Sequence, residues 1–386
     1  MTDQELQYRK VIAEMLLSEG MDEIDLQMRP ELDLLPAEAA LTAELDIQFP
    51  EGLAPAPTPP DPNTITTDPL PKADVVAITW TVDEQSALAD VLTPGFGRNT
   101  WTRYNRRFDQ FYVPLIRHGA PSLQAHRLGS WCLTKIGQTS VLCFKSELHL
   151  NQDGIFDGVA PGVATLPVKD LFKQIIEEAQ PQLVITVGTS GGVFKNHDLG
   201  DVVVTRAAKF NCRREFKNAD FNHEQIFKSE WEVPRKHFKT AVGLMQKFAD
   251  KLKEAPIQAP TVRHTGTPFK APVYKPDIKQ EGFSDIPEFH PILTTDFFEY
   301  GTSKNKLDEV CLAVEMGDAV LGLVAEGLGS DAPDWVVVRN LSDPQINGEL
   351  ASAIGDAYAV WYYKKYGYWT SVMSALTTWA IVAGLK

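Results

Sequence analysis

The sequence predicts an α/β fold, in which a mixed and largely parallel sheet carries helices on both of its faces. Two observations support this prediction. Short apolar runs rich in β-branched residues alternate with longer stretches whose apolar residues recur at helical spacing. The clearest run, Leu183–Val187, is almost entirely apolar, as expected for a strand that other elements cover on both sides.

The first 73 residues differ in composition from the rest of the chain. Apolar residues at helical spacing predict a helix over residues 4–18, and a second short helix is expected over 37–45. Residues 50–71 contain eight prolines, which fix the backbone angle φ and remove amide donors. We therefore predict a small acidic helical module at 1–49, joined to the main domain by an extended Pro-rich linker at 50–73.

The main domain is predicted over residues 74–366, with an insertion at 206–290. Its expected elements are, in chain order, a strand at 74–80, a helix from residue 81, a hairpin of strands 131–136 and 140–144, a helix at 168–179, strands at 183–187, 199–205 and 291–298, a helix at 312–327, a strand at 335–339 and a helix at 348–363. The insertion holds one expected helix at 235–254 and is otherwise irregular. An extra C-terminal helix is expected over 367–386.

Composition narrows the class of protein. The chain has 386 residues and a net charge of -14, and 15 of its acidic residues lie among the first 73 residues. This charge argues against a nucleic-acid binder, which needs a basic surface. Four scattered cysteines and dispersed histidines show no metal-ligand spacing, so no metal ion or other cofactor is expected.

No targeting segment is expected in this chain. Its first residues lack the basic start and the apolar run of a signal peptide. Residues 369–385 are moderately apolar, but they include several Ser and Thr and are short for a membrane span. We therefore expect a packed helix there, and a cytoplasmic protein in a reducing compartment.

Three segments carry most of the information about function. Glycine-rich residues 188–192 directly follow the strand at 183–187, and a turn at the carboxyl end of a strand is where α/β sheets bind ligands. The other two segments are Val314-Glu-Met-Gly-Asp-Ala319 and Val336-Val-Val-Arg-Asn-Leu-Ser-Asp343.

In order and spacing, these segments resemble the purine nucleoside phosphorylase superfamily, in particular the methylthioadenosine/adenosylhomocysteine nucleosidases. The resemblance covers residues 74–366 apart from the insertion. It implies a three-layer α/β sandwich of the nucleoside phosphorylase type, a homo-oligomer, and a small-molecule purine nucleoside or nucleotide as ligand. Some bacterial antiviral systems carry domains that resemble this family and destroy adenine nucleotides. The acidic N-terminal arm is then a candidate contact for another protein or subunit.

Cleavage of a purine N-glycosidic bond needs two carboxyl groups, because the leaving purine takes up a proton and the attacking water loses one. The resemblance implies that Asp343 is the general acid at the purine and that Glu84 is the base that activates water. Each residue has a structural alternative. Asp343 followed by Pro344 suits a helix N-cap, and Glu84 suits the first turn of a helix.

The resemblance also implies contacts to the sugar and to the purine. Glu315 and Met316 match the ribose-contacting segment, but Gly317 stands where the family has a second glutamate. Asp318 is a candidate substitute, and a deoxy or otherwise modified sugar is the alternative. The remaining candidates are Thr189, Ser190 and Gly191 at the sugar, and Phe297 and Phe298, which either stack on the purine or belong to the core.

One arginine-rich segment offers candidate phosphate ligands. Arg98, Arg103, Arg106, Arg107 and Arg117 suit inorganic phosphate or a 5′-phosphate, or else form a solvated surface. We therefore expect a purine nucleoside or nucleotide N-ribosyl hydrolase. The alternatives are a phosphorylase that uses inorganic phosphate, and a catalytically decayed sensor that binds a nucleoside or nucleotide.

Overall fold

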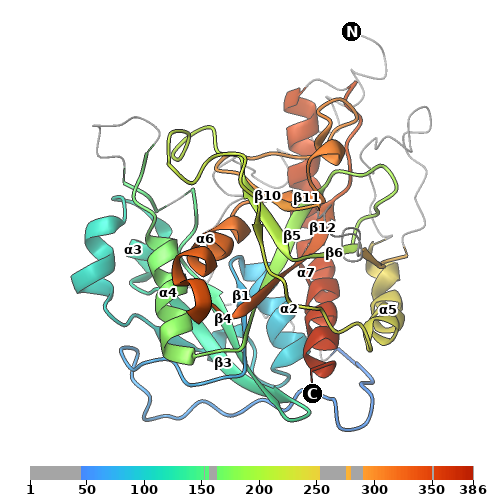
Figure 1. Cartoon of the computed structure of the whole chain (residues 1–386). Helices are drawn as coiled ribbons and strands as arrows, with labels where there is room; N and C mark the ends of the chain where they lie inside the picture. The colour runs from blue at the N-terminus through green and yellow to red at the C-terminus, as the bar shows by residue number, and fades with distance from the viewer. Residues whose placement is uncertain are drawn as a thin grey trace.

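The computed structural model describes residues 45–151, 153–155, 163–252, 275–279, 290–349 and 352–385. The helix predicted at 4–18 and nearly all of the 1–49 module lie outside these residues. The described chain forms a mixed sheet with helices on both faces (Figure 1). This arrangement confirms the predicted three-layer α/β sandwich.

Twelve strands make up the described part of the sheet. They are β1 (Val75–Thr79), β2 (Thr102–Tyr104), β3 (Gly129–Ile136), β4 (Thr139–Ser146), β5 (Leu183–Gly192), β6 (Val202–Thr205), β7 (Ala207–Phe210), β8 (Phe227–Lys228), β9 (Ile278–Lys279), β10 (Ile292–Thr294), β11 (Ala313–Glu315) and β12 (Asp334–Asp343). The main path is β2-β3-β4-β1-β5-β11-β10-β7-β8, and β12, β6 and β9 branch from β5.

Strand β5 joins the two parts of this branched sheet. Its first residues pair in parallel with β1, whereas Gly191 and Gly192 pair antiparallel with β11. β12 runs parallel to β5 along nearly its whole length, and β3 and β4 form the predicted hairpin. Because β1, β5 and β12 are parallel, their carboxyl ends meet at one edge of the sheet.

Alternate residues of the central strands enter two separate apolar cores. In β1, Val75 and Ala77 contact one core, and Val76 and Ile78 contact the other. The first core is covered by α2 (Val82–Leu92), α5 (Phe238–Met245) and α7 (Ser352–Ala383), and the second by α3 (Pro121–Ala125), α4 (Pro167–Ala179) and α6 (Asp318–Leu328) (Figure 1). Burial on both sides explains why the strand sequences are so uniformly apolar.

The glycine-rich segment 188–192 is not a turn, contrary to the sequence-based expectation. It continues β5, and it is paired with β12 on one side and, at its end, with β11 on the other. The helix expected at 312–327 begins only at Asp318, because residues 313–315 form β11 beside β10. Both differences extend the sheet toward the segments singled out for function.

Part of the expected insertion at 206–290 belongs to the sheet. β7 pairs with both β10 and β8, and β9 pairs with β6. The helix expected at 235–254 is shorter than predicted, since α5 ends at Met245 and continues as a 3₁₀ segment over 246–252. The insertion is therefore interwoven with the domain.

The Pro-rich stretch at 50–73 is not a free linker. The backbone N–H groups of Ala56 and Thr58 donate to carbonyl groups of β3, and the indole N–H of Trp379 donates to the Leu53 carbonyl. Leu70 is buried in the second core. Proline keeps this stretch extended, as predicted, and the stretch packs on the domain.

The expected extra C-terminal helix is the second half of α7, which runs without a break from 352 to 383. The buried hydroxyl groups of Thr370, Ser374, Thr377 and Thr378 donate to carbonyl groups of the preceding turn. This pairing allows a Ser- and Thr-rich helix to lie inside the first core. Among the described helices, none is long and apolar enough to cross a membrane.

Candidate active site

Glu84 lies buried where β1 ends and α2 begins, in a capping box with Thr81. Its Oε2 atom accepts hydrogen bonds from the Thr79 hydroxyl at 2.9 Å and from the backbone N–H groups of Trp80 and Thr81 at 3.0 and 2.9 Å. Its Oε1 atom accepts from the backbone N–H and the hydroxyl of Thr189, both at 2.8 Å. The first-turn role that the sequence allows is therefore present, and the same carboxylate also bridges β1 and β5.

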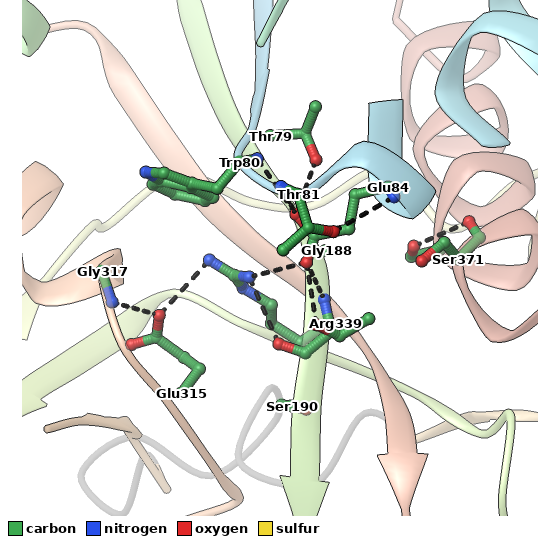
Figure 2. A network of polar contacts seen from close by, with 12 residues as sticks. Thr79, Trp80, Thr81, Glu84, Gly188, Ser190, Glu315, Gly317, Arg339 and Ser371 are labelled. Carbon is green, nitrogen blue, oxygen red and sulfur yellow. Dashed lines mark hydrogen bonds and ion pairs between the residues drawn. The ribbon is translucent and has the colours of Figure 1, made fainter. Parts of the chain in front are cut away.

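Arg339, on β12, is the buried centre of a cluster of acidic side chains (Figure 2). Its guanidinium donates to Asp318 at 2.5 and 2.8 Å, and lies 3.3 Å from Glu315 Oε2 and 3.8 Å from Glu84 Oε1. The same group lies 4.7 Å from the centroid of the Trp80 ring. One buried cation thus faces three buried carboxyl groups, which could not otherwise lie so close together.

Glu315 ends β11, and its carboxylate binds the first turn of α6. It accepts hydrogen bonds from the backbone N–H groups of Gly317 at 2.5 Å and Asp318 at 3.0 Å, and from the Thr294 hydroxyl. Burial and the nearby Asp318 carboxylate raise the pKa of Glu315 above its ordinary value. Met316, half-buried, connects the strand to the helix. Protein donors therefore hold both Glu315 and Asp318.

Gly188 is required by this cluster rather than by a turn. A Cβ atom at this position would lie 2.5 Å from both Arg339 Nη1 and Glu84 Oε1. Such contacts are shorter than van der Waals distance allows, so any side chain would push the cation and the carboxylate apart. The glycine lets β5 pass directly beneath them.

Asp343, at the end of β12, has very different surroundings. It is 5% exposed, its Oδ1 lies 3.1 Å from the Ser342 hydroxyl, and its Oδ2 has no hydrogen-bond partner among the described residues. Burial raises the pKa of Asp343 to about 8, and the Ser342 hydroxyl opposes this only in part. The N-cap alternative is wrong, because irregular residues and not a helix follow Asp343. The carboxyl group is mostly protonated at neutral pH and can act as an acid.

Strand β5 connects the two carboxyl groups. Thr189 binds Glu84, and a Cβ atom on Gly191 would lie 3.1 Å from Asp343 Oδ2. A strand rises about 3.3 Å per residue, so the two carboxyl groups meet β5 about 7 Å apart. Ser190 lies between these contacts, and its hydroxyl donates to a backbone carbonyl of β12.

The two predicted purine-stacking residues follow β10. Phe298 is 40% exposed, with its ring centroid 5.9 Å from that of Tyr300, and Phe297 is half-buried under the guanidinium of Arg213 at 4.8 Å. The Cα atom of Tyr300 would lie 3.6 Å from a Cβ on Gly191. This aromatic segment therefore borders the Asp343 end of β5, and Phe298 is not a core residue.

The structure does not bring the five predicted phosphate-binding arginines together. Arg106 pairs with a glutamate of α4 at 3.1 Å, Arg107 lies 4.4 Å from a phenylalanine ring, and Arg117 lies 3.8 Å from another glutamate. Arg103 is exposed on β2, and the carbonyl of Arg98 accepts a hydrogen bond from α2. Their role as phosphate ligands stays a prediction.

Two residues of the cluster, Arg339 and Trp80, have no assigned role in the sequence-based prediction. A signal exists for Arg339, because an arginine within an otherwise apolar strand must find buried partners. Trp80 gives no such signal, since an aromatic residue at a strand end is commonly part of a core. Within the described ranges, no group of three or more His, Cys, Asp or Glu side chains is arranged to hold a metal ion.

Neither a protein-family model nor a curated protein matches this sequence. Several solved structures are similar to it. One is a futalosine hydrolase of Helicobacter pylori, with 12% sequence identity, a TM-score of 0.44, and coverage of 81% of this chain and 99% of that chain. Another is a methylthioadenosine/adenosylhomocysteine nucleosidase from Neisseria meningitidis in complex with methylthio-immucillin-A. Its sequence identity is 15%, its TM-score is 0.43, and the match covers 81% of this chain and 100% of that chain. A third is a protein from Borrelia burgdorferi assigned to the same nucleosidases and bound to adenine. Its sequence identity is 15%, its TM-score is 0.43, and the match covers 80% of this chain and 98% of that chain.

Proposed function

We propose that this protein hydrolyses the N-glycosidic bond of a purine nucleoside or nucleotide and releases the free base. The observation that carries the proposal is the state of Asp343, which is buried, mostly protonated at neutral pH, and without a described hydrogen-bond partner at Oδ2. A leaving purine needs a proton in the transition state. A positioned acid whose pKa lies near the working pH supplies that proton most efficiently.

In the proposed reaction, Asp343 donates its proton to a ring nitrogen of the purine. The bond between the sugar C1′ and the purine nitrogen breaks, and its electron pair moves to the base. A water molecule attacks C1′ and loses a proton to Glu84. Among the donors to Glu84, the Thr189 hydroxyl can rotate away, so Oε1 can accept the water in exchange.

The spacing of the two carboxyl groups supports this assignment. Thr189 and Gly191, the β5 residues beside the two carboxyl groups, lie about 7 Å apart along the strand, which is compatible with a sugar bound between acid and base. Phe298 and Tyr300 border the acid end, where a purine would find aromatic neighbours. The order of the three sequence segments supports the same reaction.

From the motif resemblance we also propose a cytoplasmic homo-oligomer, with adenine nucleotides, as consumed by antiviral effectors, among its candidate substrates. Incubation with adenosine, methylthioadenosine, AMP and ATP, followed by chromatography of the products, identifies the substrate. Light scattering of the purified protein gives the number of subunits.

The deciding experiment is the substitution Asp343→Asn. An amide cannot donate the proton, so release of free base should fall about 10²- to 10⁴-fold. The matched control is Asp334→Asn, at the exposed opposite end of the same strand, which should leave turnover unchanged. Near-normal turnover by a folded Asp343→Asn protein would contradict the proposal.

A further inference from the structure

Trp80 occupies the space beside Gly317 at the start of α6. A Cβ atom at position 317 would lie 3.2 and 3.4 Å from the indole atoms Cζ2 and Cε2. The backbone itself does not require glycine, because φ is -166°, an extended value that any residue adopts. The indole ring, only 5% exposed, is therefore the neighbour that a side chain at position 317 would crowd.

This pair of residues lies within the Arg339 cluster. The backbone N–H of Trp80 donates to Glu84, and its ring lies between the guanidinium of Arg339 and the ring of Phe172, whose centroid is 6.0 Å away. Figure 2 shows Trp80 and Gly317 on the same side of Arg339. A sugar whose C1′ faces a water molecule on Glu84 therefore has the indole ring as a neighbour.

The other carboxylates of the cluster are already held by protein donors. Asp318 is fully buried and accepts from Arg339 at two points. Glu315 accepts from the backbone N–H groups of residues 317 and 318, from Arg339, and from the Thr294 hydroxyl, which alone among these donors can rotate away. Glu315 therefore cannot accept hydrogen bonds from both hydroxyl groups of a ribose without breaking the cluster.

We propose that Trp80 and Gly317 together make this site selective for purine nucleosides or nucleotides whose sugar lacks the 2′-hydroxyl group. This inference rests on the proposed N-glycosidic hydrolysis and names its substrate class. A ribose would place a hydroxyl donor against an aromatic ring, beside carboxylates that protein donors already hold, which is unfavourable in a buried site. A 2′-deoxy sugar presents a methylene group there, which packs on the indole.

The direct test compares matched substrates with the wild-type protein. Adenosine, guanosine and AMP are each paired with their 2′-deoxy counterparts, and release of free base is measured by chromatography. We expect kcat/KM to be about 10- to 100-fold higher for the 2′-deoxy substrates, with a KM no higher than that of the ribonucleoside. A KM that rises about tenfold or more when the 2′-hydroxyl is removed would overturn the inference. Release of no base from either set contradicts the proposed reaction itself.

A second test separates recognition from the intrinsic reactivity of the substrates. A 2′-hydroxyl withdraws electrons and slows glycosidic cleavage in any enzyme, so this effect cancels when a variant is compared with the wild type. The double variant Trp80→Ala/Gly317→Glu supplies both room and a free acceptor. Its ratio of kcat/KM for ribo over deoxy substrates should rise about tenfold or more above the wild-type ratio.

Trp80→Phe is the matched control, because it keeps an aromatic face beside position 317 and should keep the wild-type ratio. An unchanged ratio in a folded double variant overturns the inference. Near-ultraviolet circular dichroism checks folding, and if the double variant does not fold, the KM comparison with the wild type decides alone.

Discussion

Glu84 and Asp343 are both buried carboxyl groups at the same edge of one sheet, but they have opposite surroundings. Glu84 accepts hydrogen bonds from five described groups and faces a guanidinium. Among the described residues, the Asp343 side chain is paired only with the Ser342 hydroxyl. Donors and a nearby cation favour the charged form of a carboxyl group, whereas burial alone favours the neutral form. The two carboxyl groups thus differ in the number of their donors and not in their burial.

A break in strand register explains why Arg339 does not also neutralise Asp343. Side chains four residues apart on a regular strand point to the same face of the sheet. The pairing of β12 with β5 shifts between Leu341 and Asp343, however, so this alternation is interrupted before the strand ends. Such irregularities commonly redirect a side chain beside an active site. The shift leaves Asp343 outside the cluster that Arg339 holds together.

The largest expected effect is that of Glu84→Gln. Glutamine keeps the size of the side chain, but its amide cannot take a proton from water. Turnover should fall about 10²- to 10⁴-fold, and added phosphate should not restore it. Chromatography of the products with and without phosphate measures both quantities. Rescue by phosphate, with a sugar 1-phosphate as product, would mean that the enzyme is a phosphorylase and that Glu84 is not a base.

Arg339→Gln tests whether the guanidinium stabilises the buried acidic cluster that includes Glu84. Without the guanidinium, three buried carboxylates lack their cation, and the free energy of unfolding should fall by about 3–5 kcal/mol. The control Arg106→Gln breaks the more exposed ion pair with Glu178 and should cost less than about 1 kcal/mol. Urea unfolding measures both losses. Equal losses would show that the charge of Arg339 is not what stabilises the cluster.

Asp343→Asn tests the raised pKa of Asp343 through the pH dependence of stability. The folded-state pKa of about 8 lies above the ordinary value of 3.8, so the folded protein binds this proton more tightly than the unfolded chain. The contribution of Asp343 to stability is therefore greatest below pH 4 and is lost as the pH rises toward 8. Asparagine carries no such proton, so from pH 5 to pH 8 the variant should gain about 3 kcal/mol relative to wild type. A difference in unfolding free energy that does not change with pH would contradict the raised pKa.

The smallest expected effect is on the turnover of the wild-type protein at alkaline pH. The proposed acid must be protonated, so kcat should fall about tenfold per pH unit above the pKa of about 8. A pH profile from 6 to 10 with a saturating nucleoside measures this. A rate that rises through the same range would remove Asp343 from the role of general acid.

The sequence motifs predicted the site better than they predicted its chemistry. Glu84, Glu315 and Asp343 each follow or end an apolar strand, and Thr189, inside β5, contacts Glu84. The raised pKa of Asp343 could not be predicted, since it depends on which distant residues exclude water from it. For the arginine-rich segment at 98–117 the phosphate-binding role stays a prediction, because composition does not say where long side chains point.

The sequence by itself determined the α/β class, most of the strands and helices, and the polar residues that end the central strands. Hydrophobic periodicity and helix capping act over a few neighbouring residues, so a linear pattern records them. Only the tertiary structure decided that Gly188 continues a strand beneath Arg339 and Glu84, and that the Trp80 ring packs against position 317. Those outcomes depend on contacts between residues more than 100 positions apart, which no local pattern can encode.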